Sequence, residues 1–208
     1  MTTVNRNEVL LEGTAQGTAE WSHRNHGTDF YRLLLRIPRL SGTPDLLPVL
    51  LPESLLHLTE QASDLRVQGQ LRSFNNRSGI GNKLILTVYA QDICPGTGEP
   101  CNRITLSGTL CKPPVFRCTP LGRSICDLML AVPRRYGRTD YLPVIAWGQL
   151  AVQSGQLQVG DSLALEGRIQ SRTYHKQTDT GTEQRTAYEV SMMQLLEEPQ
   201  KEEIFSLL

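Results

Sequence analysis

The chain has 208 residues, of which 39% are hydrophobic and 20% are charged, and its 21 Lys plus Arg are balanced by 21 Asp plus Glu. This composition is typical of one globular domain or two small ones, and it excludes collagen-like, coiled-coil and intrinsically disordered chains. No apolar run approaches the roughly 18–20 residues of a membrane span, and no signal-peptide core follows Met1. We therefore expect a cytoplasmic protein with no membrane contact.

The residue types that carry chemistry are sparse and scattered. The five cysteines lie seven to ten residues apart and include no C-x-x-C pair that could hold zinc. The four histidines form no ligand cluster, and no P-loop sequence occurs. The sequence thus predicts free thiols, no metal, no cofactor, no catalytic residue and no enzyme activity.

One internal repeat organises the chain. Residues 7–13 (N-E-V-L-L-E-G) match residues 102–108 (N-R-I-T-L-S-G), and residues 45–49 (D-L-L-P-V) match residues 140–144 (D-Y-L-P-V), both at an offset of 95. Farther along, the G-Q-L-R-S that begins at Gly69 matches the G-R-I-Q-S that begins at Gly167 at an offset of 98. A repeat at nearly constant offset indicates two copies of one structural unit.

Each copy is rich in short alternating or β-branched runs, which are typical of strands. In chain order, the predicted strands span residues 9–13, 30–37, 46–51, 65–71 and 84–88 in the first copy, and residues 104–110, 125–132, 141–147, 162–170 and 187–193 in the second. The helix-compatible segments, residues 52–62 and 149–154, both follow the third strand.

Five strands with one helix after the third is the arrangement of the oligonucleotide-binding (OB) fold. We predict an all-β chain of two tandem OB-fold five-stranded Greek-key barrels, each with one short helix between strands 3 and 4. The predicted divisions are an N-terminal domain over residues 1–93, a Pro/Gly linker over 94–101, a C-terminal domain over 102–196 and a short acidic-apolar tail over 197–208. A pair of β-sandwiches with an incidental helix is the alternative.

Several blocks of the second copy carry a family resemblance. They are N-R-I-T-L-S-G at 102–108, K-P-P at 112–114, T-P-L-G at 119–122, L-A-V-P-R at 130–134, Y-L-P-V-I-A-W-G at 141–148, L-E-G-R-I-Q-S-R-T-Y at 165–174 and R-T-A-Y-E-V at 185–190. In this order and spacing they resemble the bacterial single-stranded DNA-binding protein family. The first copy carries a degraded version of the same motifs.

The resemblance implies that aromatic residues of the second copy stack on bases. Tyr136, Tyr141, Trp147 and Tyr174 fall near positions where the family places such residues. Tyr141 and Trp147 are six residues apart, so on a regular strand both point to the same face. If that face is outward both can stack on bases, and if it is inward both belong to the core; the resemblance favours the outward orientation.

Basic residues also concentrate in the second copy. Residues 103–188 hold eleven Lys or Arg and six Asp or Glu, a net of +5, whereas residues 1–98 are neutral. A positive surface favours binding to phosphates in a salt-dependent manner. The predicted phosphate contacts are Lys112, Arg117, Arg134, Arg135, Arg138, Arg168, Arg172 and Lys176. Among them, Arg134, Arg135 and Arg138 lie in the predicted loop between the second and third strands.

The first copy lacks the matching aromatic residues. Leu46 stands where the second copy has Tyr141, Pro52 stands for Trp147, and Ser41 stands for Tyr136. A different aromatic platform could form from Trp21, Phe30, Tyr31 and Phe74, although Phe30 and Tyr31 lie in an apolar strand that suits the core. We therefore expect the first copy to serve mainly in assembly, with weak or auxiliary DNA contact.

The sequence as a whole predicts sequence-independent binding and protection of single-stranded DNA in replication, repair or recombination of a bacterium, phage or mobile element. By analogy with the family, a homodimer would bring four OB folds together, and replication or repair proteins are possible partners. A primosome-type accessory protein or an OB-fold scaffold that acts mainly through protein contacts is the alternative.

Overall fold

The computed structural model describes residues 6–76, 81–178 and 181–196, without the side chains of Arg135 and Thr178. Over these residues the chain is almost entirely strand, with eleven strands connected by hydrogen bonds and three short helices. The predicted all-β class is therefore confirmed. All five cysteines are free thiols, and no described helix is long and apolar enough to cross a membrane.

The first copy comprises β1 (Asn7–Asn25), β2 (Thr28–Ile37), β3 (Asp45–Pro52), the 3-10 helix η1 (Glu53–Glu60), β4 (Asp64–Asn75) and β5 (Leu84–Pro95). Strand β1 pairs with both β2 and β4, β2 pairs with β3, and β5 pairs with β4 and, in parallel, with β3. These pairings close a ring of five strands, which removes the free edges of an open sheet.

The second copy comprises β6 (Cys101–Leu110), β7 (Val115–Cys118), β8 (Ser124–Pro133), the 3-10 turn η2 (Arg135–Gly137), β9 (Thr139–Trp147), α1 (Gln149–Ser154), β10 (Ser162–Thr178) and β11 (Gly181–Leu196). Here β6, β8, β9, β11 and β10 close the corresponding ring. Strand β7 is an additional edge on β8. Its four residues are all exposed, so it lacks the alternation that predicts a strand from sequence.

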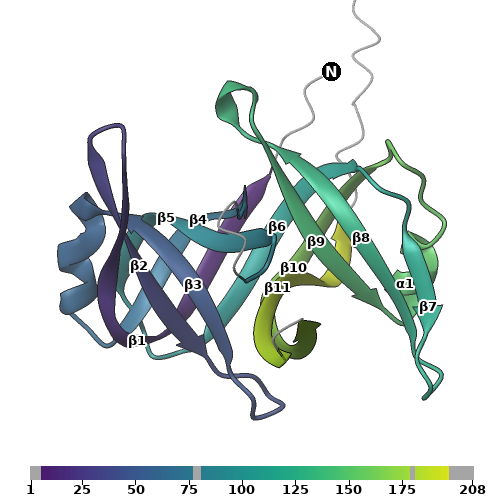
Figure 1. Ribbon diagram of the computed structural model, residues 1–208, viewed down its shortest axis with the longest axis horizontal. Coiled ribbons are helices and arrows are strands. Elements are labelled where there is room, and N and C mark those ends of the chain that lie inside the picture. Colours follow the sequence, from purple (N-terminus) through teal and green to yellow (C-terminus); the bar gives the residue numbers. More distant parts are fainter. Residues whose placement is uncertain (1–5, 77–80, 179–180, 197–208) are drawn as a thin grey trace, which may run out of the picture.

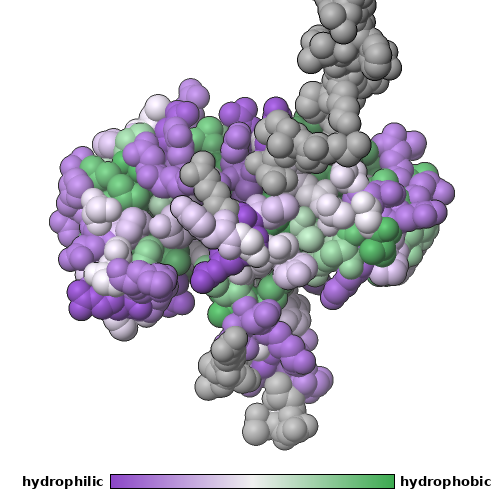
Figure 2. Space-filling model, turned by 90° about the horizontal axis from the view of Figure 1, so that it is seen from above, coloured by the Kyte–Doolittle hydropathy of each residue, from purple (hydrophilic) through white to green (hydrophobic). Residues whose placement is uncertain are grey.

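Alternating side chains fill each ring. In the first copy Leu33, Leu35 and Ile37 of β2 point inward, and in the second copy Leu128, Leu130 and Val132 of β8 occupy the equivalent positions; all are at most 4% exposed. Because successive side chains of a strand point to opposite faces, the residues between them lie on the outer surface. That outer surface holds the candidate functional residues, and seen from above it is mostly hydrophilic with separate small apolar groups (Figure 2).

The two copies are joined through their first strands, which pair antiparallel from Asn7–Leu106 to Glu12–Cys101. Val9 pairs with Ile104, which is its own equivalent at the repeat offset of 95. The pairing therefore relates the copies by an approximate two-fold axis through these two residues. In Figure 1 the copies form two lobes, with the β8–β9 turn at the top between them and the β2–β3 turn at the bottom.

Glycines mark the places where strands approach each other most closely. A Cβ on Gly69 would lie 2.1 Å from the carbonyl oxygen of Tyr89, and one on Gly167 would lie 2.4 Å from that of Ser191. Both glycines sit where the strand register shifts at a bulge. The repeated glycine in both copies is thus explained by backbone proximity, which no side chain can relieve.

We expect Gly69→Ala to destabilise the fold by about 2 kcal/mol, because the methyl group must displace the backbone of β5. Urea unfolding followed by circular dichroism measures this change. The exposed neighbour Gln68 provides the control, since Gln68→Ala removes a side chain without crowding the backbone. Equal midpoints for the two variants would contradict the close approach.

Glu12 anchors the segment that connects the copies. Its Oε1 accepts a hydrogen bond from the Thr97 hydroxyl (2.7 Å) and another from the Thr97 backbone N–H. The Thr97 hydroxyl, with help from the backbone N–H groups of Thr97 and Gly98 and from Arg66, lowers the pKa of Glu12 below its ordinary value of 4.5, against the opposing effect of burial. The ionised carboxylate is therefore the form that the folded chain prefers.

A carboxylate whose pKa is lowered by folding stabilises the fold above its unfolded-state pKa and loses that contribution as the pH falls through the folded-state value. We expect the stability of Glu12→Gln to fall less than that of the parent chain between neutral pH and pH values below 4.5, because the variant has no carboxylate to protonate. Thermal melts over this range measure the effect, with the exposed Glu20→Gln as the control. A Glu12→Gln curve parallel to that of the parent chain would contradict the assignment.

Candidate nucleic-acid interface

Tyr141 and Trp147 lie at opposite ends of β9 with their rings toward solvent. Tyr141 is 50% exposed and Trp147 is 41% exposed, whereas Leu142, Val144 and Ala146 between them are at most 2% exposed. Apart from Ile145, which is 6% exposed, side chains alternate along the strand, and both rings lie on the outer surface of the second copy. Of the two orientations that the spacing allowed, the structure has the outward one.

Arginines of β10 share this outer surface. Strand β11 lies between β9 and β10, and its Ser191 pairs with Ile145 on one side and with Arg168 on the other. Directly paired residues lie on the same face of a sheet. Because β10 runs antiparallel to β9, Arg168 lies level with the middle of β9 and Arg172 lies nearer to Tyr141. We refer to Tyr141, Trp147, Arg168 and Arg172 together as the stacking face.

The two arginines of the stacking face differ in exposure and in their contacts. Arg172 is exposed, and its guanidinium lies 5.8 Å from the ring centroid of Tyr174. Arg168 is partly buried, and its Nε has no hydrogen-bond partner among the described residues. A buried donor without a partner is costly, because it loses its hydrogen bond to water. A phosphate or base oxygen arriving at this face could accept from the Arg168 guanidinium.

Tyr174 lies on the β10–β11 hairpin and is half-buried against the first copy. Its hydroxyl donates to Oδ1 of Asn82 (2.9 Å), and Arg185 of the same hairpin donates to the carbonyl oxygen of Gly81 (2.6 Å). Lys176 is exposed farther along β10. The hairpin that carries four of the predicted DNA contacts, Arg168, Arg172, Tyr174 and Lys176, is therefore held by the β4–β5 connection of the other copy.

Two further predicted contacts lie away from these strands. Arg117 on β7 shares a cross-strand row with Trp147, because Ile125 of β8 pairs with both. Its guanidinium is 50% exposed and forms an ion pair with Asp127 at 3.0 Å. Exposed pairs of this kind contribute little net stability, so the pairing leaves Arg117 available to a ligand. Lys112 is exposed in the connection between β6 and β7.

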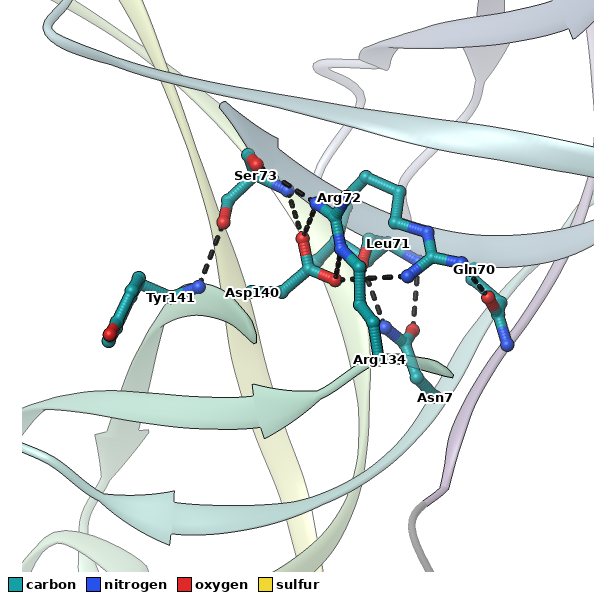
Figure 3. A network of polar contacts seen from close by, with 8 residues as sticks. All are labelled: Asn7, Gln70, Leu71, Arg72, Ser73, Arg134, Asp140 and Tyr141. Atoms are coloured by element: carbon teal, nitrogen blue, oxygen red, sulfur yellow. Dashed lines mark hydrogen bonds and ion pairs between the residues drawn. The ribbon is translucent and has the colours of Figure 1, made fainter. Parts of the chain in front are cut away.

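Arg134 is not a free loop arginine, because its guanidinium is held in a contact between the two copies. Its guanidinium pairs with Asp140, whose side chain is fully buried, and donates to the carbonyl oxygen of Ser73 (3.0 Å). The same carboxylate accepts from the Ser73 backbone N–H (2.5 Å) and pairs with Arg72 (3.2 Å). Figure 3 shows Asp140 surrounded by these groups, which come from both copies. We refer to Arg134, Asp140, Ser73 and Arg72 as the Asp140 clamp.

The Asp140 clamp also fixes the start of the stacking face. The backbone N–H of Tyr141 donates to the Ser73 hydroxyl at 2.8 Å. In this way a serine of the first copy holds the backbone of a predicted stacking residue in the second. Arg134 acts as a structural residue in this contact, and its role as a DNA contact stays a prediction.

An equivalent clamp joins the copies on the other side of the two-fold axis. Asp45 is 1% exposed and pairs with Arg39, and Arg39 donates to the carbonyl oxygen of Ser171 at 2.9 Å. The backbone N–H of Ser171 donates in turn to Asp45 (2.7 Å). The hydrogen bond to Asp45 is the main reason that the pKa of Arg39 is raised. A counterpart of Arg72 is missing here, because the equivalent residue is Gln170.

Tyr136 stands at the tip of the β8–β9 turn and is 98% exposed. Its backbone has φ 63° and ψ 35°, which is the left-handed region that a tyrosine rarely adopts. Such a conformation costs on the order of 1 kcal/mol or more and needs support from its surroundings. Arg138 in the same turn is exposed, whereas the side chain of Arg135 lies outside the described residues.

A cleft of about 1060 Å³ opens on the first copy beneath this turn. Its floor is the outer surface of the first copy, which is the equivalent of the stacking face, and its rim includes Tyr136 and Arg138. Phe74, Tyr89, Phe30 and His23 line it. Of these, the sequence singled out Phe30 and Phe74, but it did not show that they lie beside Tyr89 and His23.

Comparison with known proteins bears on the second copy first. Residues 101–196 match the Single-strand binding protein family. A crystal structure of the wild-type single-stranded DNA binding protein from Thermus aquaticus superposes with a TM-score of 0.75 at 26% identity, over 94% of this chain and 93% of that one. The second copy therefore matches this family, and the chain as a whole is similar in fold to a bacterial single-stranded DNA binding protein. The family resemblance noted in the sequence is thus confirmed.

Curated relatives of the family match over shorter segments. The "Single-stranded DNA-binding protein" of Thermus aquaticus is 35% identical over 115 residues, which are 53% of this chain and 42% of that protein. The one from Neisseria meningitidis serogroup A is 36% identical over 98 residues, which are 43% of this chain and 55% of that protein. The chain thus spans about half of these relatives or less.

Among the described residues, no group of three or more His, Cys, Asp or Glu side chains is arranged to hold a metal ion. The candidate interface is built from aromatic rings, guanidinium groups and backbone. The clamps, which the sequence analysis did not identify, also have a recognisable signal in the sequence. Each copy has Arg followed six residues later by Asp, as Arg39 and Asp45 in the first and Arg134 and Asp140 in the second.

We expect Asp140→Asn to destabilise the chain by about 3 kcal/mol, because it leaves two largely buried arginines without their shared carboxylate. Urea unfolding measures the change. Asp127→Asn is the matched control, since its ion pair with Arg117 is exposed and should matter by less than about 1 kcal/mol. A small effect at Asp140, no larger than at Asp127, would show that the clamp does not hold the copies together.

Proposed function

We propose that the chain binds single-stranded DNA without reading its sequence, through the stacking face of the second copy. The observation that carries the proposal is the outward orientation of Tyr141 and Trp147 at the two ends of β9, on the same outer surface as the arginines of β10. Flat aromatic surfaces accept any base, because every base has a π-face, and flanking arginines neutralise the phosphates. The printed names of the curated relatives, which describe single-stranded DNA binding, support this reading.

The proposed contacts have distinct roles. Bases stack on Tyr141 and Trp147, with Tyr174 and Tyr136 at the ends of the path. Phosphates are met by the arginines and lysines along the same surface, which are Lys112, Arg117, Arg134, Arg135, Arg138, Arg168, Arg172 and Lys176. In this set we weight Arg168 and Arg172 most, because they share the outer surface with both stacking residues, and Arg134 least, because Asp140 already occupies its guanidinium.

We further propose that the two closed strand rings are tandem OB-fold barrels, over residues 1–93 and 102–196, with a linker over 94–101 and a tail over 197–208. The repeated closure of five strands supports this division, as does a helix after the third principal strand of each ring. The predicted tail lies outside the described residues. The pairing of the two first strands makes the tandem chain the equivalent of a dimer of single barrels.

The biological role follows by inference from the family. We propose that the chain protects single strands in the cytoplasm, at the nucleoid, during replication, repair or recombination, with no covalent chemistry of its own. We also propose that it forms a homodimer, which would bring four barrels together. Replication or repair proteins are the expected partners.

Alanine substitution of the stacking residues tests the proposal. We expect Tyr141→Ala and Trp147→Ala each to weaken binding of a fluorescein-labelled oligo-dT by roughly 5- to 150-fold, which corresponds to about 1–3 kcal/mol for each lost stack. Fluorescence anisotropy measures the affinity. Trp21→Ala is the matched control, because Trp21 is an aromatic residue of the first copy with 61% exposure and lies outside the stacking face.

Retained affinity in both variants would overturn the stacking face as the binding surface. If the parent chain itself fails to bind at low salt, the alternative of an OB-fold protein that acts mainly through protein contacts takes precedence. Both variants remove only partly exposed rings, so circular dichroism spectra like that of the parent chain are expected.

A further inference from the structure

The backbone at Tyr141 lies beyond the part of β9 that its own copy pairs on both edges. One edge of β9 pairs with β8 along the whole strand, whereas the other edge pairs with β11 only at Val144 and Ile145. The backbone N–H of Tyr141 donates instead to the Ser73 hydroxyl at 2.8 Å. A serine of the first copy therefore takes the place of a strand partner at the residue where the stacking face begins.

Ser73 is itself held firmly against the second copy. Its backbone N–H donates to Oδ1 of Asp140 (2.5 Å), and its carbonyl oxygen accepts from Arg134 (3.0 Å). Asp140 is fully buried and directly precedes Tyr141 in the chain. All three polar groups of Ser73 thus bind to the second copy, and together they hold two consecutive residues of β9. In Figure 3 the Tyr141 ring points away from these contacts, so the ring is free while its backbone is fixed.

The β4–β5 connection that follows Ser73 holds a second proposed stacking residue. Oδ1 of Asn82 accepts from the Tyr174 hydroxyl at 2.9 Å, and Nδ2 of Asn82 donates to the carbonyl oxygen of Thr186 on β11. The first copy therefore supports the second copy's aromatic residues at two places, one on β9 and the other on the β10–β11 hairpin. Of these two contacts, the one at Ser73 acts on backbone alone and leaves the whole aromatic side chain available.

The equivalent contact in the Asp45 clamp has no aromatic residue to hold. There the backbone N–H of Leu46 donates to the Ser171 hydroxyl at 3.4 Å, and the backbone N–H of Ser171 donates to Asp45 at 2.7 Å. Leu46 stands where the second copy has Tyr141. The same backbone contact thus occurs twice in one chain, once at a proposed stacking residue and once at a leucine.

We propose that Ser73 is a positioning residue for DNA binding, which acts through the backbone of Tyr141. The proposal rests on the proposed function, because it requires that Tyr141 stack on a base. A group that is held in its bound position before the ligand arrives loses less freedom on binding, and this raises the affinity. The first copy thereby contributes to the affinity of the second copy's stacking face, independently of any contact of its own with DNA.

Ser73→Ala tests this role, because it removes the hydroxyl and keeps the backbone groups that bind Asp140 and Arg134. We expect it to weaken binding of a fluorescein-labelled oligo-dT by roughly 3- to 10-fold, in keeping with the loss of one hydrogen bond. Ser171→Ala is the matched control, since it removes the equivalent hydroxyl beside Leu46 and should bind like the parent chain. Fluorescence anisotropy at one fixed salt concentration measures all three affinities.

A double-mutant cycle separates positioning from a purely structural role. In a Tyr141→Ala background the Ser73 hydroxyl has no ring to position, so adding Ser73→Ala should change the affinity by less than about twofold. In a Trp147→Ala background the same substitution should keep its full effect. Hydrogen–deuterium exchange reports on the bond itself, and the peptide that contains the Tyr141 amide should exchange faster in Ser73→Ala than in Ser171→Ala.

The outcomes separate this inference from the proposed function. Parent-like affinity in Ser73→Ala, with weakened binding in Tyr141→Ala, would overturn the positioning role alone. Equal losses in Ser73→Ala and Ser171→Ala, or a loss that persists without the Tyr141 ring, would also overturn it, since either result indicates a general disturbance of the structure. Parent-like affinity in both Tyr141→Ala and Trp147→Ala would overturn the proposed function and the role of Ser73 with it. Weakened binding that depends on Tyr141, with faster exchange of its amide, would establish Ser73 as a positioning residue.

Discussion

The antiparallel pairing of β1 with β6 is the constraint on which the rest of the structure depends. Because Val9 pairs with its own equivalent Ile104, every feature of one copy meets its counterpart across a two-fold axis. The two buried aspartates, Asp45 and Asp140, then fall opposite the serines of the other copy. A buried carboxylate is stable only when its partners are in place, so each clamp demands the arrangement that the strand pairing creates.

On this symmetric frame the two copies have diverged in side chains. The second copy places Tyr141 and Trp147 on an open strand surface, where the first has Leu46 and Pro52. The first copy instead places Phe74 and Tyr89 in a cleft that a turn of its neighbour overhangs. One backbone plan therefore offers two different aromatic surfaces, and the β8–β9 turn lies next to both of them.

Much of the fold could be predicted from the sequence, because the repeat and the alternation of side chains are local patterns. The core strands and the helix-compatible segments lie close to their predicted positions. The exposed edge strand β7 and the long β1–β2 hairpin lack such alternation. The role of Arg134 could not be predicted either. Because it lies next to Arg135 in a predicted loop, the sequence indicates an exposed cation, and only the contact with Ser73 of the other copy shows that it belongs to the clamp.

The most direct test of the central claim uses the natural fluorescence of the stacking face. The chain has two tryptophans, so Trp21→Phe leaves Trp147 as the single probe. Titration with unlabelled oligo-dT from about 50 to about 300 mM salt should quench Trp147 to saturation, and the affinity should fall as salt rises, by about 0.7 in the log–log slope for each phosphate contacted. Unchanged fluorescence at the lowest salt would contradict base stacking on this surface.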